Sequence, residues 1–383
     1  MSPDASPSFV AEKPEVVTGP NPEATAAGHT AGHAAAGRTT VATTGATTGA
    51  TTGGQTPSVA RPGFRRRAGD RVVAGVVIGG MELIRRLPDA PLWWLGNVAG
   101  NIEYRVAKSR RDEARRNLRR VVEWMAAHRV GDERYHRAAT DGRALEEIVR
   151  SAFRHHAHYY IELARAPRFD WEYLEKRLVI DDPAAVDAAL AERKALLLVG
   201  LHFGTIELPG FLALHKIGQV VAPMESLRNE RVQAYMKRTR GVIGVRILTI
   251  EEAGPELLAV LRRNEPIGII ADRDLTGSGL EVELFGAKTK IPAGPALLAT
   301  ETGAPAYVSG VRRVGPGRYR GVLWPVPTPA GSSRRERSRS MVREEAVLFE
   351  RVIVDAPEQW LAVFHTIWPD LETARKTNIG EPA

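Results

Sequence analysis

The sequence contains no cysteine among its 383 residues. This absence excludes disulfides, a thiolate nucleophile and thiolate zinc sites, and it suits a reducing compartment. Long apolar runs are also scarce. The stretch Val72–Leu87 is apolar, but glycines and charged residues interrupt it, and a membrane-spanning helix needs roughly 20 apolar residues. We therefore expect no spanning helix and, if the protein meets a membrane, a peripheral attachment.

Large apolar residues are almost absent from residues 1–62, which are rich in Ala, Thr, Gly and Pro and contain a T-T-G-A near-repeat. Such a composition cannot offset its ordering entropy, and it lacks the basic and apolar regions of a signal peptide. We predict a disordered segment over 1–62, a folded domain over 63–373 and a flexible end over 374–383. Within the domain, 63–165 is predicted to be a helical, membrane-docking region and 166–373 to be an α/β core.

The charge is unbalanced, with 53 Lys and Arg against 45 Asp and Glu, a formal charge of +8 and a pI near 9.8. This predicts an anionic partner, either nucleic acid or an anionic membrane surface. No helix-turn-helix, RNP or zinc-finger pattern is present, so we do not expect a nucleic-acid partner.

The region before residue 126 favours the membrane. Trp93 and Trp94 are aromatic residues of the kind found at headgroup depth. A helix is predicted over Tyr104–Met125, and it carries a basic stripe. Two interpretations of that helix stay open, an interfacial element or an ordinary solvated basic face over core. The four cations of the stripe are Lys108, Arg111, Arg115 and Arg119.

Apolar strands and helical stretches alternate after residue 194, which predicts an α/β fold with a mainly parallel central sheet flanked by helices. The predicted strands are 195–199, 220–222, 245–250, 267–271, 306–310 and 319–326, and the intervening helices are 206–216, 229–240 and 255–263. A polar exposed loop is predicted over 332–340, followed by a final helix.

Polar residues follow three of these strands. His202, Glu225 and Asp272 each come where a strand ends, and open α/β sheets place their chemistry at the carboxyl ends of their strands. Thr205 is the expected N-cap of the next helix, and Glu207 lies in its first turn. Glu207 can turn back to orient the His202 imidazole as a base, or it can simply complement the helix N-terminus.

A second group of histidines, His155, His156 and His158, does not predict a metal site. On a helix only residues three or four apart share a face, which leaves two of the three together and no third ligand.

Three motifs carry a family resemblance. They are H-x-x-x-x-E at 202–207, D-R-D-L-T-G-S-G-L-E-V from residue 272, and P-E-Q-W at 357–360. Together they resemble the lipid A biosynthesis lauroyl/myristoyl acyltransferase family over about Val72–Trp368. The D-R-D-L opening, the E-S-L-R-N segment from Glu225 and the Arg240–Gly241 pair resemble more closely the branch that acylates phosphatidylinositol mannosides.

The resemblance implies transfer of a fatty acyl group from acyl-CoA or acyl carrier protein to a sugar hydroxyl of a membrane glycolipid, with no further cofactor and no metal. His202 is then the general base, and Glu207 and Glu281 are the candidate partners of its imidazole. Backbone N–H groups near Gly204 and Thr205 are the expected oxyanion donors. The substrate-binding residues are expected to be Glu225, Arg228, Arg240, Asp272, Arg273 and Asp274.

The same resemblance places the enzyme peripherally on the cytoplasmic face of the cell membrane. Two alternatives stay open, an acyltransferase acting on a lipid A-type or lysophospholipid acceptor, and a membrane-peripheral glycosyltransferase. The carboxyl-terminal segment reads H-T-I-W from His365, where relatives often have H-R-R-W, so a phosphate contact by those arginines is not expected here. Without a partner nearby in the sequence, His365 is not expected to be a second base.

Overall fold

The computed structural model describes residues 64–191 and 195–372. The disorder predicted for 1–62 and the flexible end predicted for 374–383 lie outside the described residues.

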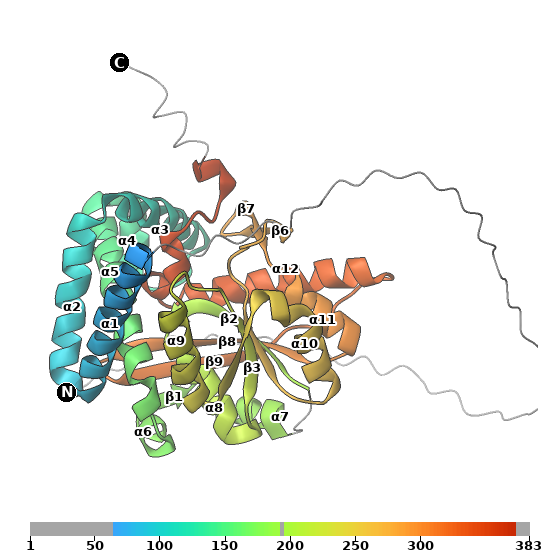
Figure 1. The fold of residues 1–383 in the computed structure, drawn as a ribbon. Coiled ribbons are helices and arrows are strands. Elements are labelled where there is room, and N and C mark those ends of the chain that lie inside the picture. Colours follow the sequence, from blue (N-terminus) through green and yellow to red (C-terminus); the bar gives the residue numbers. More distant parts are fainter. Residues whose placement is uncertain (1–63, 192–194, 373–383) are drawn as a thin grey trace, which may run out of the picture. The chain divides into compact units, whose positions relative to one another are not determined.

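A seven-stranded sheet forms the centre of the fold, in the order β1-β9-β8-β2-β5-β3-β4 (Figure 1). Within the described residues only β8 and β9 pair antiparallel in this sheet, so the predicted mainly parallel α/β fold is confirmed. The bounds are β1 Leu178–Ile180, β2 Leu197–Gly204, β3 Val220–Met224, β4 Val245–Thr249, β5 Ile267–Ile270, β8 Ala306–Gly315 and β9 Arg318–Pro325.

Strand β2 is buried on both faces, which explains its unbroken apolar sequence. Leu197, Val199 and Leu201 belong to the main core, with helices α10 (Ile250–Arg262), α11 (Gly294–Thr302) and α12 (Arg334–Ile353). Leu198 belongs to a separate cluster with α7 (Pro183–Ala191) and α8 (Glu207–Ile217). The short helix α6 (Trp171–Glu175) precedes β1 in the sequence, and helix α9 (Glu230–Val242) connects β3 to β4.

The first five helices of the described chain, α1 to α5, are gathered at one side of the sheet (Figure 1). The helix predicted over 104–125 is wrong as a single element, because the chain leaves helical geometry at Ala107 (φ −88°, ψ 64°). The five are α1 Phe64–Arg86, α2 Asp89–Val106, α3 Lys108–His128, α4 Glu133–Thr140 and α5 Gly142–Arg165.

Two elements differ from the prediction after residue 270. The loop expected over 332–340 is wrong, because α12 begins at Arg334, where Ser333 and Glu336 form a reciprocal capping box. The segment between β5 and α11 contains a separate antiparallel hairpin of β6 (Leu280–Leu284) and β7 (Ala287–Ile291).

Candidate active site

His202 and Asp272 lie side by side because β2 and β5 are neighbouring parallel strands. The Nδ1 atom of His202 is 2.7 Å from Oδ1 of Asp272, and the backbone N–H of His202 donates to Oδ2 at 2.9 Å. The His202 side chain is 32% exposed, whereas that of Asp272 is 1% exposed. A carboxylate at Nδ1 holds the proton of the neutral ring there, so the lone pair lies on Nε2.

Trp360 completes the environment of the carboxylate. Its buried indole N–H donates to Oδ2 of Asp272 at 2.8 Å. Burial by itself raises the pKa of Asp272, but the charge of His202 and the hydrogen bonds from His202 and Trp360 hold that pKa below its usual value. Asp272 therefore stays ionised. Trp360 belongs to the P-E-Q-W motif, which indicated a family resemblance but did not predict this contact.

Glu358 and Gln359 of the same motif also form hydrogen bonds to other parts of the fold. Glu358 accepts hydrogen bonds from Arg134 at 2.9 Å and from the Tyr135 hydroxyl at 2.8 Å. Gln359 accepts from the backbone N–H of Arg313 and donates to its carbonyl, both at 2.8 Å. The motif thus attaches the carboxyl-terminal segment to α4, to β8 and to the His202–Asp272 pair.

Glu207 does not orient the imidazole, so this prediction is wrong. Its carboxylate forms a buried ion pair with Arg240 of α9 at 3.0 Å, and the Tyr159 hydroxyl is 3.3 Å from the same guanidinium. Burial lowers the pKa of Arg240, but the Glu207 charge more than offsets this, and the pKa is raised overall. Arg240, predicted to bind substrate, has its guanidinium engaged inside the protein by Glu207, the first residue of α8.

Glu281 is not a partner of the histidine either. It lies on β6, exposed, and pairs with Lys288 at 3.0 Å. The neighbouring Val282 and Leu284 are the buried side of the hairpin, so strand alternation directs Glu281 to solvent. The expectation that Glu281 stabilises the imidazole is therefore wrong.

Asp274 shapes the loop that follows β5. Its carboxylate accepts backbone N–H bonds from Thr276 at 3.1 Å, Gly277 at 3.0 Å and Gly279 at 2.8 Å, and these bonds hold its pKa below the usual value although burial raises it. In the described structure Asp274 is thus a turn-forming residue. Its predicted contact with substrate stays a prediction.

Arg273 and His365 belong to the surroundings of His202. Burial, followed by the positive charges of Arg273 and His202, lowers the pKa of His365 to about 4, so its ring is neutral at physiological pH. Glu225 and Arg228 are exposed in the segment between β3 and α9. For Glu225, Arg228 and Arg273 the substrate-binding role stays a prediction.

Contrary to the expectation from the sequence, Thr205 neither caps α8 nor leaves its backbone N–H free for substrate. Helix α8 has Ile206 at its N-cap and no side-chain cap, so the predicted Thr205 cap is wrong. The Thr205 backbone N–H donates to the Val311 carbonyl at 2.9 Å, and this bond engages the N–H that was expected to stabilise an oxyanion.

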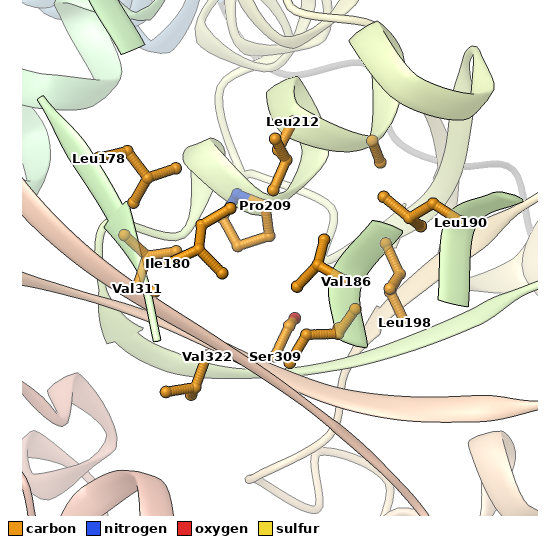
Figure 2. Close-up of a pocket in the computed structure, with 13 residues that line it drawn as sticks. Leu178, Ile180, Val186, Leu190, Leu198, Pro209, Leu212, Ser309, Val311 and Val322 are labelled. Carbon is orange, nitrogen blue, oxygen red and sulfur yellow. The ribbon is translucent and has the colours of Figure 1, made fainter. Parts of the chain in front are cut away.

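An apolar pocket lies on the α7 and α8 side of the sheet (Figure 2). Its empty space is about 450 Å³, including the open mouth. Leu198 of β2 lines it, four positions before His202 on the same strand, and Ser309 is its one polar lining residue. The remaining lining residues are Leu178, Ile180, Val186, Leu190, Pro209, Leu212, Ala213, Val311, Gly321, Val322 and Leu323.

Exposed apolar side chains concentrate on α1 and α2. Val76 is 71% exposed and Trp94 is 63% exposed. Trp93 instead stacks on His158, with ring centroids 4.2 Å apart, so only one tryptophan of the pair faces outward. Among the described side chains of these helices, the other large apolar ones that are exposed are Val72, Val73, Val77, Leu83, Leu95, Ile102 and Val106.

The expected basic stripe on α3 does not consist of four free cations, because two of the four are engaged within the protein. Arg115 forms ion pairs with Glu146 and Asp112, and Arg111 donates to the Tyr104 carbonyl at 3.1 Å. Lys108 and Arg119 are exposed. No helix in the described part of the chain is both long and apolar enough to cross a membrane.

Comparison with known proteins assigns the family. The family model for bacterial lipid A biosynthesis acyltransferase matches residues 65–369. The chain belongs to this family. The acyltransferase is 29% identical over 232 residues to the phosphatidylinositol mannoside acyltransferase of Mycolicibacterium smegmatis, an alignment that covers 60% of the chain and 71% of the relative. It is 32% identical over 165 residues to the phosphatidylinositol mannoside acyltransferase of Mycobacterium tuberculosis, covering 42% and 52%.

These matches confirm the resemblance carried by the sequence motifs. The protein is an O-acyltransferase, and the family favours acyl transfer over the glycosyl transfer that the sequence left open.

Proposed function

We propose that this acyltransferase moves a fatty acyl group from acyl-CoA or acyl carrier protein to a sugar hydroxyl of a phosphatidylinositol mannoside, with His202 as general base. The His202–Asp272 pair carries the proposal, because it presents an oriented imidazole at the carboxyl edge of a parallel sheet.

The chemistry needs one base and no covalent acyl-enzyme. Nε2 of His202 takes the proton of the acceptor hydroxyl as its oxygen attacks the thioester carbon, and Asp272 stabilises the resulting imidazolium. The tetrahedral intermediate then collapses, the carbon–sulfur bond breaks, and the proton passes from His202 to the departing thiolate. The products are an ester and a free thiol.

The proposed acceptor is based on the two relatives named above, both of which are phosphatidylinositol mannoside acyltransferases. A lipid A-type or lysophospholipid acceptor fits the same chemistry and is an outcome of the test below. The charge of +8 supports an acceptor with an anionic headgroup, and the exposed Glu225, Arg228 and the half-buried Arg273 are the side chains proposed to contact it.

The acyl chain of the donor is proposed to enter the apolar pocket of Figure 2. The labelled Pro209 and Leu212 of α8 and Val186 and Leu190 of α7 border this space. Helix α8 starts five residues after His202, so the pocket and the base share the β2–α8 unit. An apolar enclosure with few polar groups suits a fatty chain.

The membrane surface is proposed to meet α1 and α2 from the cytoplasmic side. Their exposed valines, leucines and Trp94 can be buried in the headgroup region, and Lys108 and Arg119 add attraction to anionic lipid. Attachment is then peripheral, and it brings the embedded acceptor to the enzyme.

Radiolabelled palmitoyl-CoA incubated with the protein and total polar lipid tests the proposal, with His202→Ala as control. We expect a labelled acylated mannoside lipid, and a loss of about 10²- to 10⁴-fold in turnover for the variant. Label in a lipid A-type or lysophospholipid product would overturn the acceptor. Wild-type turnover of His202→Ala would overturn the base.

A further inference from the structure

A buried polar network lies against the segment that follows His202, and no step of the reaction above uses it. Arg313 of β8 is at its centre, with a side chain only 1% exposed. Its Nε donates to Oε1 of Glu162 on α5 at 2.7 Å, and its Nη2 donates to the Gly204 carbonyl at 2.7 Å. Its Nη1 is 3.2 Å from Nδ1 of His155.

The second carboxylate oxygen of Glu162 contacts Thr205, the residue that follows Gly204. Its Oε2 accepts a hydrogen bond from the Thr205 hydroxyl at 2.6 Å. The Glu162–Arg313 pair thus contacts two consecutive residues, the Gly204 carbonyl through the cation and the Thr205 side chain through the anion. Both residues lie between His202 and Glu207.

The backbone of the same segment is close to β8. Gly204 has φ +54°, and a Cβ on it would lie 2.0 Å from the Val311 carbonyl oxygen. Only glycine allows this close approach. The chain direction that β2 takes after His202 is therefore set by contacts from α5 and β8.

A buried ion pair is by itself weak evidence of a role in stability. Apolar side chains of similar volume often replace a buried ion pair without loss. They could not, however, accept a hydrogen bond from Thr205 and donate one to the Gly204 carbonyl. What the charged pair adds is a fixed position for these two residues.

We propose that Glu162 and Arg313 are positioning residues for the acyl transfer. They hold Gly204 and Thr205 so that the His202 ring stays at a fixed place relative to the bound thioester. This rests on the proposed function, in which His202 is the base. A displacement of about 1 Å at a catalytic group can lower the rate about a hundredfold, so the network acts on turnover rather than on substrate binding.

Thr205→Val tests the network with the smallest change, since it removes the hydroxyl and keeps both charges and the side-chain shape. With palmitoyl-CoA and purified phosphatidylinositol mannoside, we expect kcat to fall about ten- to a hundredfold and KM to stay within about twofold. The pH at which activity is half-lost on the acid side should not move, because His202 and Asp272 are unchanged. Thr205→Ser, which keeps the hydroxyl, should restore kcat to within about threefold.

Thr140→Val is the matched control, because Thr140 is an exposed threonine on α4, and its kinetics should equal those of the wild type. If Thr205→Val does not fold, Thr205→Ala removes the same hydroxyl with less crowding. Wild-type kcat in the hydroxyl-free variant, or a loss confined to KM, overturns the positioning role. The His202→Ala control separates the two proposals, since activity in that variant overturns the base whatever Thr205 shows.

Discussion

Asp272 contacts His202 at two points, the ring Nδ1 at 2.7 Å and the backbone N–H at 2.9 Å. One carboxylate thereby fixes both the ring and the strand that carries it. Because the carboxylate is buried and the imidazole is partly exposed, charge is held inside the protein while Nε2 can face a substrate.

Asp272, the observed partner of His202, should matter far more for turnover than Glu281, one of the two partners expected from the sequence. Asp272→Asn keeps the shape but removes the charge that stabilises imidazolium, so turnover should fall about 10²- to 10⁴-fold. Glu281→Gln should leave turnover within about threefold of wild type, because Glu281 is exposed and pairs with Lys288. Steady-state thiol release measures both. A larger loss for Glu281→Gln would show that the described pairing is not the catalytic one.

The Glu207–Arg240 pair should behave as a buried ion pair. Arg240→Met leaves the Glu207 carboxylate, whose side chain is 5% exposed, without its cation, and should lower the free energy of unfolding by about 3–5 kcal/mol. The double variant Glu207→Leu, Arg240→Met removes both charges and should recover most of that loss. Urea unfolding of the single and double variants measures it. Equal destabilisation of both would contradict an ion-pair origin.

Glu345 should make the protein less stable as the pH rises. This glutamate of α12 is fully buried with no hydrogen-bond partner for either oxygen in the described structure, and burial raises its pKa from 4.5 to about 8. The folded state thus holds a proton that the unfolded state releases. Its contribution to stability is fully present below pH 4.5 and is lost as the pH rises to about 8.

Glu345→Met removes this proton linkage. The gain in unfolding free energy of the variant over wild type should grow by a few kcal/mol between pH 5 and pH 8.5, as measured by urea unfolding at both pH values. Glu344→Met, its half-buried neighbour on α12, is the control and should show no such growth. A constant difference at both pH values would mean that Glu345 is ionised in the folded protein.

Membrane binding should depend on apolar side chains of α1 and α2. The triple variant Val72→Gln, Val76→Gln, Trp94→Gln should bind both neutral and anionic vesicles at least about tenfold more weakly, because each buried apolar side chain contributes about 1.5–3 kcal/mol. Vesicle sedimentation measures the binding.

Two controls accompany this measurement. Val347→Gln changes a valine that is 58% exposed on α12 and should bind as wild type. Lys108→Gln with Arg119→Gln should weaken binding to anionic vesicles alone, and less so at high salt. Unchanged binding of the triple variant would place the docking surface elsewhere.

The apolar pocket should select acyl-chain length. Ala213→Phe fills the space between α8 and the sheet, so the rate with palmitoyl-CoA should fall at least about tenfold more than the rate with octanoyl-CoA. Ala127→Phe, at an exposed position of α3, is the control for the added ring. An equal effect of Ala213→Phe on both donors would show that the chain binds outside this pocket.

Local patterns in the sequence were enough for the fold class, and they singled out His202 as the candidate base. The apolar runs of β2 to β5 predicted a mainly parallel sheet because a strand buried on both faces must be apolar throughout. The ends of these strands named His202, Glu225 and Asp272, and the motifs named the family. The S-x-x-E pattern at Ser333 is also a local signal for the start of α12.

The partner of His202 was decided only by the tertiary structure. Glu207, five residues on, is directed by the first turn of α8 toward Arg240, whereas Asp272, 70 residues away, meets the ring. The cause is the strand order, which places β5 beside β2. No local periodicity in the sequence encodes that strand order, because it depends on contacts between segments far apart in the chain. The tertiary structure alone also decided the places of Trp360, Glu162 and Arg313. These residues come from separate parts of the sequence, and the fold brings them to the same edge of the sheet as His202.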